Sequence, residues 1–123
     1  MVEFRDLKLN EETPIYLQII RYVKMGIVAG TFTSGDELPS RRILSAMLKV
    51  NPNTVQKAYA FLEEEKLLVS YPGAKSILTV TEIQKSQIRE ELIQREAFNY
   101  IRSAKQMGFS KSEAEKILEI LLE

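Results

Sequence analysis

Two short helical patterns meet at a sharp break within residues 38–59, and this break most restricts how the chain can fold. The second pattern opens with Asn51 and Pro52. Asparagine is a strong N-cap, because its side-chain oxygen accepts hydrogen bonds from the free amides of the next turn. Proline suits the first helical position, where no amide hydrogen is needed. The second helix is therefore predicted to start at a fixed, abrupt angle to the first.

The first turns of this second helix are polar, with Asn53, Thr54 and Gln56 in sequence. A helix that presents hydrogen-bonding side chains at its N-terminal end is suited to reading base edges in the major groove. The pair of helices is therefore predicted to be a helix-turn-helix that recognises double-stranded DNA.

Charge is balanced over the chain, with 17 Lys and Arg against 17 Asp and Glu. The segment between Glu37 and Glu63 nevertheless contains only basic charged residues, namely Arg41, Arg42, Lys49 and Lys57. A local basic face is sufficient to attract phosphate, because salt screens charges beyond about 8–10 Å. Charge alone is equally compatible with an ordinary solvated face.

Several classes of protein are disfavoured by composition. The chain has no Cys and no His, which removes disulfides, the usual zinc ligands and the commonest general base. No apolar run approaches the ~20 residues of a membrane span, and the N-terminus lacks a signal-peptide pattern. We therefore expect a cytoplasmic protein with no membrane association, catalytic residues, metal or cofactor.

Helical periodicity predicts three helices in the first half of the chain, over residues 14–29, 41–48 and 52–65. Thr13 is expected to cap the first helix, Gly30 to end it, and Ser40 to cap the second. Residues 1–12 are expected to form a short arm. The apolar residues expected to face inward from the second helix are Ile43, Leu44, Met47 and Leu48.

The period changes after Lys66. Residues 67–71 and 76–80 are predicted strands joined by a turn over residues 72–75, and residues 31–38 are a predicted turn or short strand. Three helices followed by a two-stranded ribbon make a winged helix-turn-helix, in which the ribbon reaches a neighbouring groove or the phosphate backbone.

Two further amphipathic helices follow, each opened by a predicted capping box, Thr81 with Gln84 and Ser110 with Glu113. Two helices of this size cannot bury their apolar faces completely on each other. A second copy of the chain is the favoured partner, and packing against the winged domain is the alternative. The predicted dimerisation residues are Ile88, Leu92, Phe98, Ile101, Ile117, Leu118 and Leu121.

The fold class that follows is mainly α with a small β component (α+β). A winged helix-turn-helix DNA-binding domain is expected over residues 1–80, and a two-helix C-terminal dimerisation tail over residues 81–123.

Three motifs in order resemble the GntR family of bacterial transcriptional regulators. They are PIYLQI at residues 14–19, GDELPSRR at residues 35–42 and NPNTVQKAY at residues 51–59. The short two-helix tail is similar to that of the YtrA-type subfamily. The resemblance implies a homodimer that binds an inverted-repeat operator. It also implies repression of the protein's own operon, which often encodes an ABC transporter.

The family's DNA contacts fall on an arginine early in the second helix, here Arg42, on the start of the third helix, and on the wing tip. The family's glycine–basic–glycine tip is Gly73, Ala74 and Lys75 in this chain, with the basic residue displaced by one position. The predicted DNA-binding residues are Ser40, Arg41, Arg42, Asn51, Pro52, Asn53, Thr54, Gln56, Lys57, Gly73 and Lys75.

At the helix-turn-helix break the family usually has glycine, where this chain has Lys49. Either Lys49 adopts a left-handed conformation at a cost of about 1 kcal/mol, or the turn differs.

Two other classes of function are alternatives to DNA recognition. A winged helix used for protein–protein contact predicts apolar side chains on the exposed face of the third helix, where Asn53, Gln56 and Lys57 are polar. An enzyme requires a cluster of reactive groups or a phosphate-binding loop, and the sequence contains no such motif. The sequence identifies no pocket for a small-molecule effector.

Overall fold

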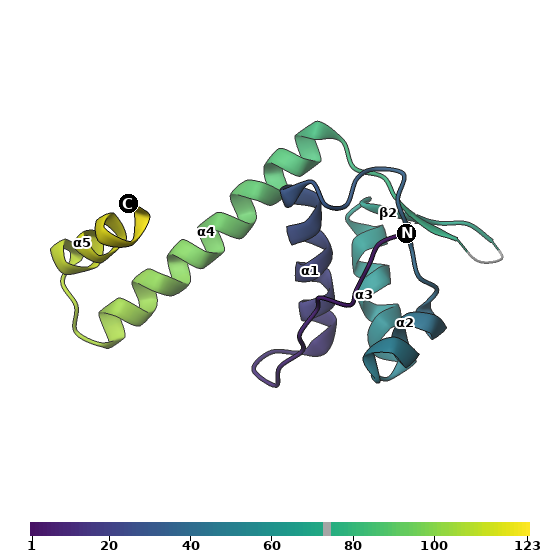
Figure 1. The fold of residues 1–123 in the computed structure, drawn as a ribbon, viewed down its shortest axis with the longest axis horizontal. Helices are drawn as coiled ribbons and strands as arrows, with labels where there is room; N and C mark the ends of the chain where they lie inside the picture. Colours follow the sequence, from purple (N-terminus) through teal and green to yellow (C-terminus); the bar gives the residue numbers. More distant parts are fainter. Residues whose placement is uncertain (73–74) are drawn as a thin grey trace. The chain divides into compact units, whose positions relative to one another are not determined.

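The computed structural model describes residues 1–72 and 75–123, so Gly73, a predicted wing contact, lies outside the described residues. Helices dominate the fold (Figure 1). The elements follow one another as α1 (Ile15–Ala29), β1 (Glu37–Leu38), α2 (Arg41–Leu48), α3 (Pro52–Glu64), β2 (Leu68–Ser70), β3 (Ser76–Leu78), α4 (Glu82–Gln106) and α5 (Lys111–Leu122).

The chain divides into two compact units, Met1–Ile88 and Arg89–Glu123. We call them the winged unit and the tail unit. The boundary falls inside α4, eight residues after the expected boundary at residue 80. The first two turns of α4 therefore belong to the winged unit, because Ile88 is buried there.

The core of the winged unit forms where α1 packs against α3. Ile19, Val23 and Ile27 repeat every four residues along α1, and all three are buried. On α3 the buried stripe contains Val55, Tyr59 and Leu62. Both stripes follow the helical period, as the buried faces of amphipathic helices do.

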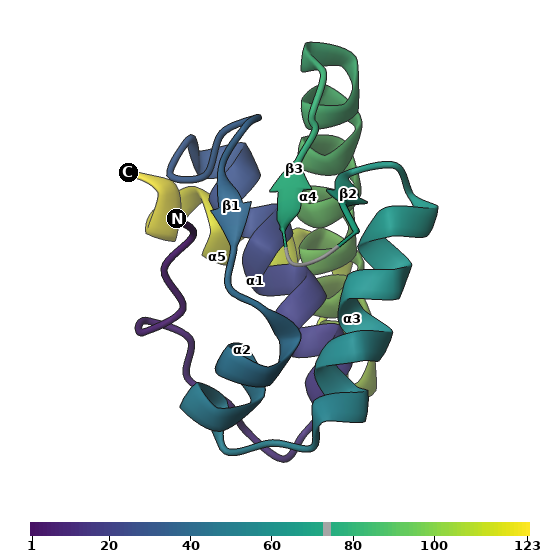
Figure 2. The ribbon, with the colours of Figure 1, turned by 90° about the vertical axis from the view of Figure 1, so that its right-hand side faces the viewer.

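The strands form a small antiparallel sheet in the order β1–β3–β2, which Figure 2 shows side by side. The predicted ribbon corresponds to β2 and β3, each three residues long and therefore shorter than expected. The segment left open as a turn or short strand supplies β1, where Glu37 pairs with Ile77. The hairpin is thus anchored along β1 to the segment that leads into α2.

The prediction that residues 1–12 form an arm is wrong. Val2 and Phe4 are buried, and the Val2 amide donates to the Glu37 carbonyl over 2.7 Å. The Phe4 ring lies 5.3 Å from the Tyr22 ring on α1. Because two large apolar side chains alternate in this segment, it is stabilised by covering the core instead of extending into solvent.

The predicted inner face of α2 needs correction. Leu44 is buried, but the side chains of Ile43 and Met47 are 54% and 52% exposed, and Ser45 is buried in their place. The helix has only eight residues and packs on α3 through one narrow stripe. Apolar residues to the side of that stripe remain in solvent.

The cap predictions are correct with one exception. The side chain of Ser40 accepts from the Ile43 amide, Gly30 ends α1 at φ 84°, and both capping boxes form. Thr13 does not cap α1, because Pro14 occupies the N-cap position and no side chain caps it.

In the tail unit, Gly108 at φ 83° separates α4 from α5. The Tyr100 hydroxyl on α4 donates to the Ala114 carbonyl on α5 over 2.9 Å, which holds the two helices together. None of the residues of α5 is buried. Within the described ranges, no helix combines the length and apolarity that a bilayer crossing needs.

Candidate nucleic-acid interface

The turn between α2 and α3 is formed by a left-handed residue followed by a helix cap. Lys49 is left-handed, with φ 59° and ψ 46°, which decides between the two alternatives left open by the sequence. The Asn51 side chain accepts from the Asn53 amide over 2.8 Å, and Pro52 occupies the first helical position. The direction in which α3 leaves the turn is therefore fixed by local interactions.

The face of α3 opposite its buried stripe is polar. Asn53, Gln56 and Lys57 are exposed, while Thr54 is half-buried beside them. Asn53 and Gln56 carry amide side chains that can each donate and accept hydrogen bonds, as base edges require. This face is available because the core uses only the other side of the helix.

Lys57 contacts a residue that sequence reasoning did not identify. Its Nζ lies 4.1 Å from the centre of the Tyr16 ring at the start of α1, within cation–π range. Further along α1, Lys24 pairs over 2.9 Å with Glu65, the residue that follows the end of α3. The N-terminal ends of α1 and α3 therefore lie at the same end of the winged unit. No spacing rule links positions 16 and 57, because their contact is made between two helices.

The two adjacent arginines of α2 lie in different environments. Arg42 is exposed. The Nη2 of Arg41 is 2.6 Å from the Oε1 of Glu63, and its guanidinium lies 5.1 Å from the Tyr59 ring. Its Nε is buried, with no hydrogen-bond partner among the described residues. Both arginines are predicted to contact DNA, but within the part of the chain that the structure describes only the side chain of Arg41 is held by contacts within the protein.

Tyr59, a buried residue of α3, is hydrogen-bonded to the segment that precedes α2. Its hydroxyl donates to the Pro39 carbonyl over 2.6 Å. Burial raises the pKa of the Tyr59 hydroxyl, and the nearby Arg41 charge partly opposes that increase. The hydroxyl therefore remains a donor over the whole physiological range.

Other predicted site residues serve the local structure. The hydroxyl of Ser40 and the side-chain oxygen of Asn51 are engaged as helix caps. Lys75 is exposed beside the wing, and its carbonyl accepts from the Tyr71 amide over 2.7 Å. Among the described residues, no group of Asp and Glu side chains is arranged to hold a metal ion.

The predicted dimerisation residues separate into two groups. Ile88 and Leu92 are already buried in the single chain. Phe98, Ile101, Leu118 and Leu121 are exposed, the first and last by 64% and 74%. Ile117 is half-buried. Of the predicted dimerisation residues, those with surface left for a partner therefore lie on α4 from Phe98 onward and on α5.

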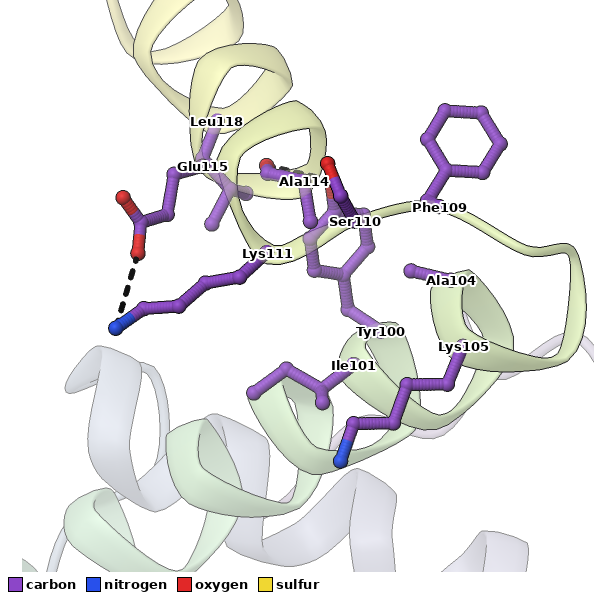
Figure 3. A pocket seen from close by; sticks show the side chains of 10 residues that line it. All are labelled: Tyr100, Ile101, Ala104, Lys105, Phe109, Ser110, Lys111, Ala114, Glu115 and Leu118. Atoms are coloured by element: carbon purple, nitrogen blue, oxygen red, sulfur yellow. Dashed lines mark hydrogen bonds and ion pairs between the residues drawn. The ribbon is translucent and has the colours of Figure 1, made fainter.

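A groove of about 410 Å³ lies between these two helices (Figure 3). Its walls are formed largely by Ile101 and Ala104 on α4 and by Ala114 and Leu118 on α5. Lys111 and Glu115 form an ion pair of 3.8 Å at its edge. Two of the exposed predicted residues, Ile101 and Leu118, therefore also line the groove.

A three-helix core, a closed helix-turn-helix, a small antiparallel sheet and a polar outer face on α3 define a winged-helix DNA-binding protein. The family model for bacterial regulatory proteins of the gntR family matches residues 15–76. This chain belongs to the GntR family, whose members are DNA-binding transcriptional regulators and not enzymes.

Similarity to individual proteins extends beyond the matched domain. The chain is 39% identical over 91 residues to the HTH-type transcriptional repressor YtrA of Bacillus subtilis (strain 168), covering 69% of this chain and 70% of that protein. A GntR family transcriptional regulator from Listeria monocytogenes is 34% identical, with a TM-score of 0.76 over 92% of this chain and 96% of that one. YtrA from Sulfolobus acidocaldarius is 33% identical, with a TM-score of 0.57 over 77% and 99%. The resemblance to the YtrA-type subfamily is confirmed.

Proposed function

We propose that this protein is a homodimeric repressor that binds an inverted-repeat operator in the cytoplasm through α3 of each copy. The observation that carries the proposal is the outer face of α3, where Asn53 and Gln56 are exposed at the start of a helix whose direction is fixed by its cap. Such a helix can enter a major groove with its N-terminal side chains against base edges.

Each part of the interface has a proposed role. Asn53, Gln56 and the half-buried Thr54 read bases. Arg42 and Lys57 are cations that neutralise phosphates, and Lys75 does so from the wing. Ser40, Asn51 and Pro52 act indirectly, because their side chains fix where α2 and α3 begin. Base readers set sequence preference, whereas phosphate contacts set affinity and salt dependence.

The second copy is proposed to bind through the tail over residues 81–123, while residues 1–80 provide the DNA-binding domain. The support is the exposed apolar surface of Phe98, Ile101, Leu118 and Leu121, which is costly to leave in water. A twofold dimer would place two recognition helices about 34 Å apart, or a multiple of that, as an inverted repeat requires.

Repression is proposed because the 39% identical relative is named as a transcriptional repressor. Control of the protein's own operon, encoding an ABC transporter, is the target that the family resemblance favours. An inverted repeat in the promoter of that operon would be the expected site.

A gel-shift experiment tests the binding proposal. The full-length chain is titrated with the inverted repeat and with duplexes in which one or both half-sites are scrambled, at physiological salt. The native repeat is expected to bind about 10³-fold or more tightly than the doubly scrambled duplex. Equal affinities for the two duplexes would overturn the proposal.

A further inference from the structure

Four polar side chains from four elements meet where the wing leaves the sheet. The Oε1 of Glu63, near the end of α3, receives the Nη2 of Arg41 at 2.6 Å and the hydroxyl of Ser70 at 2.8 Å. The Oγ atoms of Ser70 and Ser76 are 3.0 Å apart. Because the Ser70 hydrogen is donated to Glu63, Ser76 is the donor in that contact. We call these four residues the wing-base cluster.

The position of the cluster relates α3 to the hairpin. Ser70 is the last residue of β2, Ser76 is the first of β3, and the two are directly paired across the ladder. Beyond them the Tyr71 amide donates to the Lys75 carbonyl as the chain enters the wing turn. The cluster therefore joins the recognition helix to both strands at the point where they lead into the wing.

Arg41 holds the cluster from the side of α2. Its guanidinium is fixed by the carboxylate and by the Tyr59 ring, and its Nη2 also lies 3.5 Å from the Ser70 hydroxyl. The side chains of Arg41 and Glu63 are only 32% and 34% exposed, so their charge-assisted hydrogen bond is partly shielded from water. If Arg41 left this site, the Glu63 carboxylate would lose its cation and, among the described residues, keep only the Ser70 hydroxyl as a partner.

We propose that Arg41 is a positioning residue and not a DNA contact: by holding Glu63, Ser70 and Ser76 together it fixes the wing relative to the recognition helix. The inference rests on the DNA-binding function proposed above. The neighbouring Arg42 is then the phosphate contact of α2. Two adjacent arginines thereby perform different tasks, one within the protein and one toward DNA.

The experiment compares Arg41→Gln with Arg42→Gln in two backgrounds, the full-length wild type and Lys75→Ala. The probe is a duplex selected from random sequence by the wild-type protein, titrated at several salt concentrations. Losing one phosphate contact lowers the slope of log affinity against log salt by about 0.9. Lys75→Ala removes the proposed wing contact, so it separates effects that act through the wing from direct ones.

If Arg41 acts through the wing, Arg41→Gln weakens binding about tenfold in the wild-type background. In the Lys75→Ala background, Arg41→Gln weakens binding by less than about twofold, which is within the scatter of independent substitutions. The salt slope of the Lys75→Ala protein is not changed further by Arg41→Gln. Arg42→Gln lowers the slope by about 0.9 in both backgrounds. The exchange variant Arg41→Glu with Glu63→Arg recovers at least half of the lost affinity, measured on a logarithmic scale, since the ion pair is retained with its charges reversed.

Other results overturn the inference. An Arg41→Gln slope change that persists in the Lys75→Ala background would make Arg41 a phosphate contact. Full additivity with Lys75→Ala, unchanged binding in Arg41→Gln, or failure of the exchange variant to recover affinity would exclude action through the wing. If Arg41→Gln does not fold, the exchange variant decides alone. If the wild-type chain selects no sequence at all, the proposed function itself fails, and this inference fails with it.

Discussion

The winged unit and the tail unit differ in how completely their large apolar side chains are buried. In the winged unit, large side chains such as Phe4, Leu44 and Leu62 are almost completely buried. In the tail unit, Phe98 and Leu121 are mostly exposed, and α5 has no buried residue. Both units contain well-capped amphipathic helices, so local helix formation does not explain the difference. What differs is the number of elements in each unit: the winged unit has helices and a sheet around one core, whereas the tail unit has only the later part of α4 and α5.

From this comparison we predict that the winged unit folds by itself and that the tail unit needs a second surface to cover its apolar residues. Removing residues 89–123 should leave a folded monomer. Operator binding should fall by several orders of magnitude, because contact with the second half-site is no longer intramolecular. Binding to a single half-site should change little.

Sedimentation of the full-length and shortened chains, with circular dichroism to check folding, measures this outcome. A full-length chain that remains monomeric at tens of micromolar would remove the basis of the comparison, since the tail would then be stable without a partner.

A single charge placed on each unit sharpens the comparison. Leu118→Lys should weaken dimerisation by about 1–3 kcal/mol, because a twofold interface loses two leucine side chains, each 43% exposed in the single chain. Ile43→Lys is the matched control, since Ile43 is similarly exposed but lies on the winged unit. It should leave the dimerisation constant unchanged. Equal losses in both variants, measured by analytical ultracentrifugation, would contradict a tail-specific interface.

Substitutions on the outer face of α3 should change the preferred DNA sequence and leave the dimerisation constant unchanged. Asn53→Ala and Gln56→Ala should each cost about 1–3 kcal/mol on the preferred operator and alter the selected consensus. Ala60→Ser, further along the same exposed face, serves as a control. Selection from random duplexes measures the consensus, and an unchanged consensus in both alanine variants would mean that another element reads the bases.

Within the winged unit, Tyr59→Phe should lower the free energy of unfolding by about 1–3 kcal/mol, because the Pro39 carbonyl loses its hydrogen bond inside the core. Tyr71→Phe removes a hydroxyl from an exposed ring and should have no measurable effect. Urea denaturation gives both values. Equal stability of the two variants would show that water replaces the Tyr59 hydrogen bond.

The smallest effect is expected in the tail unit, where α5 depends on its local cap. Ser110→Ala should cost about 1 kcal/mol by removing the capping box with Glu113. Hydrogen bonds from the Ser110 amide and hydroxyl lower the pKa of the Glu113 carboxyl. The contribution of the Glu113 carboxylate to the stability of α5 is therefore fully present above the ordinary glutamate pKa. It is lost as the pH falls through the lowered pKa of Glu113. If Ser110→Ala left the helicity measured by circular dichroism at neutral pH unchanged, the cap would not stabilise α5.

Local features of the sequence determined where the helices begin and end. Asn51, Pro52, Ser40 and Gly30 act within one turn of their own position, so their effects can be predicted without knowing the rest of the fold. The buried stripes of α1 and α3 were also predictable, because each follows the period of a single helix. The GntR motifs add the family and the region of the DNA interface, since their order along the chain is itself specific.

Other features required the tertiary structure. Val2 and Phe4 belong to the core only because α1 offers them a surface, and Ile43 and Met47 are exposed only because α2 packs through a narrow stripe. The same reason separates the two arginines. Arg41 and Arg42 are chemically identical and adjacent in the sequence, but only Arg41 meets Glu63, 22 residues away. Contacts between distant positions depend on how the elements pack, and helical periodicity carries no information about them.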